Sequence, residues 1–234
     1  QFRTGKSTFI KIFMVLLVLP YLENVHEKEG AKDELPQSAG GKTITTTEPK
    51  FIPKEAAQIK LGADIDVKVR LIDCVGYMVE GASGHMEEDV ERMVKTPWST
   101  EEIPFTKAAE IGTRKVIKDH STIGIVITCD GSFGELPRSS FLEAEERTVR
   151  ELQEIHKPFL VLLNSSRPYA DETKQIADEI HEKYNVTVMP VNCEQLKQED
   201  INRIMENILY EFPLTMIEFY MPKWVEMLSF EHKM

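Results

Sequence analysis

The stretch Arg3-Thr4-Gly5-Lys6-Ser7-Thr8, followed by a largely apolar run over residues 9–19, decides the fold class of this chain. Gly-Lys-Ser at the start of a helix is the second half of the pattern G-x-x-x-x-G-K-S/T. In that pattern, backbone N–H groups surround phosphates, the lysine reaches the β- and γ-phosphates, and the hydroxyl binds Mg²⁺. The first glycine of the pattern would fall one place before Gln1. The stretch therefore predicts a nucleotide-binding domain truncated at its N-terminus, with its first strand missing from this chain.

Strand and helix patterns alternate along the rest of the sequence. Residues 21–41 are polar and predict a long loop, and residues 76–106 form a second long excursion. The predicted strands span residues 50–52, 66–73, 122–129, 159–164 and 186–191, and the predicted helices span residues 107–119, 139–156, 171–184 and 200–210. Strands that alternate with helices at this spacing indicate parallel β-α-β units. We therefore expect an α/β fold of three layers with a mostly parallel sheet.

The hydrophobic pattern changes at Pro213, which suggests a domain boundary. Residues 214–221 are typical of a strand, and Trp224 begins a further element. We therefore expect residues 1–212 to form one nucleotide-binding domain and residues 213–234 to be the start of a following domain.

Composition argues against several classes of protein. The net charge of −11 disfavours a nucleic-acid partner, because such a partner requires a basic face. The three cysteines are widely spaced without a C-x-x-C pair, so a reducing, cytoplasmic setting is favoured over a disulfide framework or zinc site. The apolar run over residues 13–19 is shorter than the roughly 20 residues that span a bilayer. A signal peptide is the alternative for this run, but no small-residue cleavage site follows it.

A second motif supports the first. A strand ends in Asp73, and Cys74-Val75-Gly76 completes a D-x-x-G pattern, in which the aspartate can hold Mg²⁺ and the glycine N–H can meet a γ-phosphate. Between the motifs lie threonines whose hydroxyls could bind Mg²⁺ and sense the γ-phosphate; we favour Thr46 and Thr47 over Thr43 and Thr45. Taken singly, these residues could be a strand cap and a β-forming segment. Their order favours a switch-containing, GTPase-like P-loop NTPase.

These motifs assign a role to each polar residue. The predicted catalytic residues are Lys6, Asp73, Thr46 and Thr47, and the predicted Mg²⁺ ligands are Ser7, Asp73 and Thr47. The predicted nucleotide contacts are Arg3, Thr4, Gly5, Lys6, Ser7, Thr8, Gly76 and Asn164.

The residues after the strand over 159–164 indicate which base is bound. Guanine-specific relatives carry Asn-Lys-x-Asp here, and the aspartate accepts hydrogen bonds from the guanine N1 and N2 groups. This chain has Asn164 followed by Ser165, Ser166 and Arg167. A cation cannot accept those bonds, and the unpaired donors would cost about 1–3 kcal/mol. ATP is therefore favoured over GTP.

Tyr77 follows the D-x-x-G motif directly. Many GTPases place at this position a glutamine that orients the attacking water. The tyrosine predicts slow intrinsic turnover unless another residue or a neighbouring subunit assists.

Several long strings of this sequence resemble the stage IV sporulation protein A family along nearly the whole chain. They are residues 3–11 (RTGKSTFIK), 33–38 (DELPQS), 41–44 (GKTI), 46–51 (TTEPKF), 73–77 (DCVGY), 96–98 (TPW), 109–117 (AEIGTRKVI) and 143–147 (EAEER).

The resemblance implies a spore-coat morphogenetic ATPase of endospore-forming bacteria, in which ATP hydrolysis drives irreversible self-assembly of the basement layer of the coat. It implies a location in the mother-cell cytoplasm at the forespore surface, with a small amphipathic membrane peptide as the recruiting partner and other coat proteins nearby. It assigns Lys6 and Ser7 to the phosphate loop, Asp73 to Mg²⁺, and Thr46 and Thr47 to sensing. The family's first loop glycine, its preceding strand and its later domains have no counterpart in this chain.

Two alternatives remain at this point. A GTPase of the ribosome-assembly kind predicts GTP preference and a basic RNA-binding surface, and both Arg167 and the acidic balance disfavour it. A structural scaffold that binds nucleotide only to fold is compatible with the same motifs.

Overall fold

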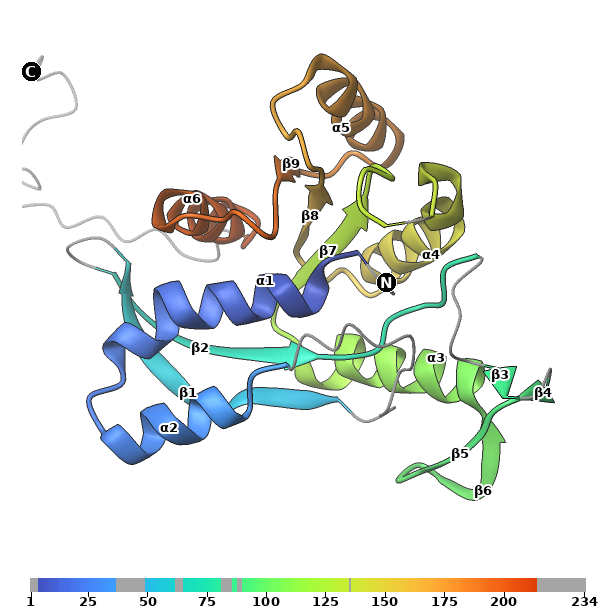
Figure 1. Cartoon of the computed structure of the whole chain (residues 1–234), viewed down its shortest axis with the longest axis horizontal. Helices are drawn as coiled ribbons and strands as arrows, with labels where there is room; N and C mark the ends of the chain where they lie inside the picture. The colour runs from blue at the N-terminus through green and yellow to red at the C-terminus, as the bar shows by residue number, and fades with distance from the viewer. Residues whose placement is uncertain are drawn as a thin grey trace, which may run out of the picture.

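The computed structural model describes residues 4–36, 49–61, 65–80, 86–87, 90–134 and 136–213 (Figure 1). The helical elements are α1 (Lys6–Phe13), η1 (Met14–Val18), η2 (Leu19–Tyr21), α2 (Val25–Asp33), α3 (Phe105–Lys115), η3 (Val116–His120), η4 (Arg138–Phe141), α4 (Leu142–Glu154), α5 (Asp171–Tyr184) and α6 (Gln198–Tyr210). The strands are β1 (Lys50–Leu61), β2 (Ile65–Asp73), β3 (Met86–Glu87), β4 (Val90–Glu91), β5 (Met93–Thr96), β6 (Ser99–Pro104), β7 (Gly124–Cys129), β8 (Phe159–Asn164) and β9 (Val188–Val191).

A parallel sheet of β7, β8 and β9, with β8 in the middle, forms the centre of the fold. Every residue of β8 is buried, as expected when helices cover both faces of a parallel sheet. Side chains of a strand alternate between its two faces. Leu160 and Leu162 accordingly belong to one hydrophobic cluster with α1 and α6, whereas Val161 and Leu163 belong to another with α4 and α5. The sheet is therefore the middle of three layers.

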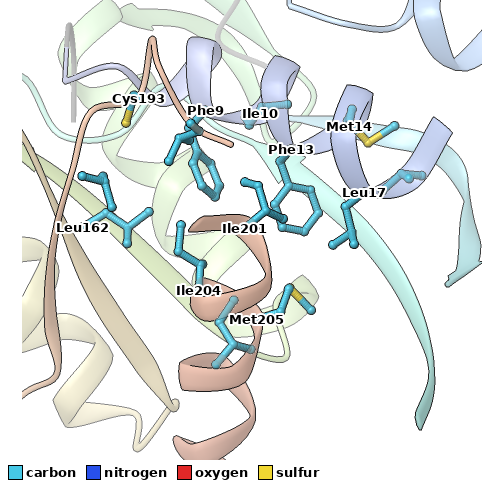
Figure 2. Packing of buried hydrophobic residues seen from close by; sticks show 14 of the residues in the cluster. Phe9, Ile10, Phe13, Met14, Leu17, Leu162, Cys193, Ile201, Ile204 and Met205 are labelled. Atoms are coloured by element: carbon cyan, nitrogen blue, oxygen red, sulfur yellow. The ribbon is translucent and has the colours of Figure 1, made fainter. Parts of the chain in front are cut away.

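Helix α1 packs on this sheet beside α6. Its buried Phe9, Ile10 and Phe13 recur at the spacing of one helix face, and the two phenylalanine rings lie 5.7 Å apart. Figure 2 shows these side chains meeting Ile201 and Ile204 of α6 and Leu162 of β8. The apolar run that follows the phosphate-loop motif is thus a core helix.

Strands β1 and β2 form an antiparallel hairpin that is not hydrogen-bonded to β7–β9 within the described residues. Between β2 and β7 lies a groove of about 560 Å³. Its walls include residues 67–72 of β2 and 124–127 of β7, and its apolar lining also includes Phe13, Met205, Val116 and Leu152. Apolar side chains make up most of the lining of this groove.

The structure confirms an α/β fold with parallel strands and locates most predicted elements. Strand 159–164 and helix 171–184 are reproduced residue for residue. The long loop over residues 21–41 is wrong for residues 25–33, which form α2. This helix begins at Asn24, whose side chain accepts a hydrogen bond from the His26 N–H, and Ala31 is its single buried residue. A helix this polar shows no apolar stripe in its sequence, so the pattern did not reveal it.

Two further corrections concern strands. The strand predicted over residues 50–52 continues to Leu61, with a register irregularity between Ile52 and Ala57 that interrupts the sequence pattern. The excursion over residues 76–106 contains the small hairpins β3–β4 and β5–β6. The strand predicted over residues 214–221 lies outside the described residues, and the domain boundary near Phe212 stays a prediction. No helix in the described part of the chain is both long and apolar enough to cross a membrane.

Candidate functional site

The Gly5-Lys6-Ser7 motif lies where the chain turns into α1. Thr4 is fully buried, Gly5 is the N-terminal cap of the helix with φ +95°, and the Gly5 carbonyl accepts the Phe9 N–H at 2.8 Å. The first N–H groups of a helix have no partner within it and carry the positive end of its dipole. They can therefore bind the oxygens of a phosphate.

Gly5 is required here for two separate reasons. Its positive φ is a conformation that side-chain-bearing residues rarely adopt. A Cβ atom at this position would also lie 2.6 Å from Nδ2 of Asn164, closer than any ordinary contact. The loop can follow this path only with glycine.

The Asn164 side chain anchors the loop by hydrogen bonds. Its Nδ2 donates to the Thr4 carbonyl at 3.1 Å, and its Oδ1 accepts the Cys193 N–H at 2.9 Å. Asn164 ends the buried strand β8 and is itself 3% exposed. Its side chain thereby fixes the phosphate loop to the segment that follows β9. The predicted contact of Asn164 with a nucleotide stays a prediction.

Lys6 and Asp73 form an ion pair next to this loop. Lys6 Nζ lies 2.9 Å from Asp73 Oδ1, and the two side chains are 22% and 17% exposed. Lys6 opens α1 and Asp73 ends β2, so the ion pair joins the two halves of the fold. The structure thus brings together the two charged residues that the separate motifs predicted.

The polar groups present are compatible with Mg²⁺. Asp73 Oδ1 is buried and has no well-directed hydrogen bond, since its contact with Lys6 is an ion pair by distance alone. Ser7 is half-buried in the first turn of α1. No group of three or more His, Cys, Asp or Glu side chains gathers for a metal within the described ranges. One carboxylate and one hydroxyl nevertheless suit Mg²⁺, which usually takes its remaining ligands from substrate phosphates and water.

Gly76, the glycine of the D-x-x-G motif, adopts φ +81° and donates its N–H to Thr113 Oγ1 at 3.1 Å. Thr113 lies on the buried face of α3. The N–H that the sequence assigned to a γ-phosphate is therefore bonded to a threonine of the protein in this structure.

Tyr77 is buried at 2% exposure and packs in a cluster with Phe141 and Ala144. Its hydroxyl donates to Glu151 of α4, and the Arg147 guanidinium lies 4.4 Å from the centre of its ring. Burial, together with the Glu151 carboxylate, raises the pKa of this hydroxyl well above its ordinary value. Tyr77 thus stays neutral and anchors the chain just after the D-x-x-G motif.

The remaining predicted residues have various places. Thr8 is half-buried on α1, and Arg167 is exposed in the loop after β8, with its N–H bonded to Ser165 Oγ at 3.0 Å. Arg3, Thr46 and Thr47 lie outside the described residues, so their roles stay predictions.

Sequence reasoning missed two contributors to the site, Thr113 and Cys193. Thr113 recurs with the apolar residues on one face of α3, and Cys193 follows β9. Burial raises the pKa of the Cys193 thiol to about 12, so the residue serves the site through its backbone N–H rather than as a thiolate. Neither role leaves a mark in the sequence, because each depends on a partner distant along the chain.

Replacing Asn164 by alanine should destabilise the 234-residue chain by about 1–3 kcal/mol, because the buried Cys193 N–H would lose its acceptor and the Thr4 carbonyl would lose the amide donor of Asn164. Urea denaturation followed by circular dichroism measures this change. Asn202→Ala on the exposed face of α6 is the control, with an expected change within about 0.5 kcal/mol. Equal effects of the two substitutions would contradict the anchoring role of Asn164.

Comparison with known proteins places these features in a family. The family model described as "Stage IV sporulation protein A, ATPase domain" matches residues 1–213. The chain is 53% identical over 230 residues to stage IV sporulation protein A of Clostridioides difficile and 50% identical to those of Bacillus subtilis and Bacillus anthracis.

Each alignment covers 98% of this chain and 47% of the relative, so the chain spans about half the length of the curated relatives it matches. No solved structure matches it. The family match, carried by the phosphate-loop and D-x-x-G segments together with nearly all the rest of the chain, shows that this protein belongs to the stage IV sporulation protein A family.

Proposed function

We propose that this chain binds Mg²⁺-ATP in a P-loop NTPase site and hydrolyses the γ-phosphate bond. The observation that carries the proposal is the pairing of Lys6 with Asp73 at the N-terminus of α1. A lysine and a Mg²⁺-binding carboxylate must lie together to act on one triphosphate. The family model is named for an ATPase domain, which supports the same activity.

The chain's own residues supply most of the chemistry. The free N–H groups of the first turn of α1 bind phosphate oxygens, and Lys6 exchanges its contact with Asp73 for one with the β- and γ-phosphates. Ser7 and Asp73 would hold Mg²⁺, which would neutralise charge that develops on the phosphates. Asn164 keeps the loop in one conformation during this exchange because both of its hydrogen bonds are made within the protein. Water then attacks the γ-phosphate in line with the leaving oxygen.

The loop after β8 supports ATP as the nucleotide. Arg167 occupies the position where a guanine-specific site carries an acidic acceptor, and its side chain is exposed to solvent beside Asn164 in sequence. A guanidinium only donates hydrogen bonds, so it cannot satisfy the guanine N1 and N2 donors.

We propose further that, in the whole protein, hydrolysis drives self-assembly at the forespore surface in the mother cell. The relatives' printed name concerns sporulation. A homopolymer that forms the basement layer of the coat, a small amphipathic membrane peptide and other coat proteins are the partners in this proposal. Thr46 and Thr47 are the proposed sensors of the γ-phosphate. The alternative, a structural scaffold that binds nucleotide only to fold, would release no phosphate from ATP.

The groove between β2 and β7 supports a strand leading into Thr4 as the missing central element of the P-loop fold. Asp73, at the carboxyl end of β2, contacts Lys6. Asn164, at the carboxyl end of β8, donates to the Thr4 carbonyl, and β8 runs parallel to β7. A strand that enters Thr4 from this groove would therefore run parallel to both neighbours. Apolar residues line both of its sides, so the strand needs apolar side chains on both faces.

Hydrolysis is tested with the full-length protein. Wild type should release phosphate from ATP, whereas Lys6→Ala and Asp73→Ala should each lower the rate by at least about 100-fold, because each removes a charge that acts on the triphosphate. A coupled phosphate-release assay measures this rate. Lys11→Ala, an exposed lysine of the same helix, is the control and should keep the wild-type rate. A wild type that binds ATP but releases no more phosphate than the variants would establish the scaffold function instead.

Nucleotide preference is tested by thermal shift of the full-length protein with Mg²⁺. ATP should raise the melting temperature more than GTP at equal concentration, since a tighter ligand stabilises the folded state more. Arg167→Asp, which introduces an acceptor for guanine, should make the rise in melting temperature with GTP closer to the rise with ATP. A larger shift with GTP for the wild type would overturn the ATP assignment.

The strand is tested by hydrogen exchange. In the 234-residue chain, the amides of residues 67–72 and 124–127 that face the groove should exchange fast, because they have no partner among the described residues; the Gly124 N–H, which donates to the Pro158 carbonyl, is not one of them. In the full-length protein they should be protected by a strand between β2 and β7. Amides 160–163 of β8 are the control and should be protected in both proteins. Equally fast exchange over residues 67–72 and 124–127 in the full-length protein would contradict the strand.

A further inference from the structure

We propose that Thr113 is a positioning residue that limits the preference of the site for ATP over ADP. Its hydroxyl accepts the Gly76 N–H, and this bond must break before a γ-phosphate can become the acceptor. This inference rests on the proposed function and assigns regulation to the same site. Its basis is the hydrogen bond from Gly76 N–H to Thr113 Oγ1, at 3.1 Å and buried.

The two uses of the Gly76 N–H exclude each other. A backbone N–H makes one strong hydrogen bond, and this one points at α3. A γ-phosphate oxygen can become its acceptor only after the bond to Thr113 has broken. The structure therefore shows the motif in a conformation that must change when ATP binds but need not change when ADP binds.

Breaking this bond costs Thr113 little. Thr113 is 3% exposed on α3, so water cannot replace the glycine at its hydroxyl. The Thr113 O–H can donate to the carbonyl four residues earlier, which here belongs to Ala109, whether or not its oxygen accepts the Gly76 N–H, so breaking the bond leaves this donor satisfied. Gly76 bears the larger cost, because its N–H needs a new acceptor, and the γ-phosphate would supply one.

The moving segment is short because both of its ends are fixed. Asp73 ends β2 in register with Lys50, and Tyr77 is buried against Phe141 with its hydroxyl on Glu151. The cation stacked on Tyr77, Arg147, is itself paired with Glu110 at 2.5 Å. Cys74, Val75 and Gly76 are the residues left to rotate. Glycine at φ +81° is the residue best able to absorb that rotation.

These contacts predict that losing the Thr113 hydroxyl strengthens ATP binding. Removing the Thr113 hydroxyl leaves the Gly76 N–H buried without an acceptor in the conformation seen here. That conformation loses stability relative to the conformation that binds a γ-phosphate. The conformational change that accompanies ATP binding therefore costs less free energy. Affinity for ATP should rise, and affinity for ADP should stay the same because ADP offers no γ-phosphate.

Thr113→Val and Thr113→Ser test this inference in the full-length protein. Valine keeps the shape of threonine without the hydroxyl and should tighten ATP binding by about five-fold with no change for ADP. Serine keeps the hydroxyl and should give the wild-type ratio of the two dissociation constants. Isothermal titration with ATP and ADP in the presence of Mg²⁺ measures the ratio, and hydrogen exchange at Gly76 in the nucleotide-free protein reports the lost bond directly.

The outcomes separate this inference from the proposed function. A wild type that binds neither nucleotide contradicts the proposed function and the inference with it. If the wild type binds ATP but Thr113→Val keeps the wild-type ratio, or weakens ATP and ADP alike, Thr113 is structural and only the inference is wrong. If both Thr113→Val and Thr113→Ser raise the ratio of the ADP dissociation constant to the ATP dissociation constant, the hydroxyl is not responsible for the effect. That result also overturns the inference.

Discussion

The conformation of the Gly5-Lys6-Ser7 loop depends on the buried side chain of Asn164. This one amide joins Thr4 to Cys193, two segments that are far apart in the sequence, at the end of the most buried strand of the sheet. Asn164 is 3% exposed, so water has little access to replace either bond, and both bonds restrain the loop. The same closeness allows only glycine at position 5. The conformation of the motif is thus imposed from the end of β8.

The site is built from two bodies that the groove separates. Lys6 belongs to α1, which is packed on the parallel sheet and α6, whereas Asp73 belongs to the β1–β2 hairpin (Figure 1). Their ion pair and the packing of α1 along both bodies hold the halves together. This geometry makes the alignment of the proposed catalytic residues a property of the whole sheet rather than of either motif.

Local patterns were sufficient wherever one face or both faces of an element are buried. Strand 159–164 and helix 171–184 were predicted with their observed bounds, because apolar burial sets the period of the sequence directly. The polar helix α2 and the extension of β1 beyond Ile52 were missed, since a solvated helix and an irregular register leave no such period. The pairing of Lys6 with Asp73 could be anticipated because two motifs with one chemical purpose must converge on the same ligand.

Local sequence patterns were enough to find the Gly-Lys-Ser and D-x-x-G motifs and the alternation of strands and helices, and the long strings carried the family resemblance that the comparisons confirmed. The packing of distant elements was needed to reveal that Asn164 supports the loop, that Tyr77 is buried with its hydroxyl on Glu151, and that Thr113 accepts the Gly76 N–H. Motifs are local because a ligand touches short segments of backbone. Hydrogen-bond partners within a buried core are fixed by packing between distant elements, and no short stretch of sequence encodes them.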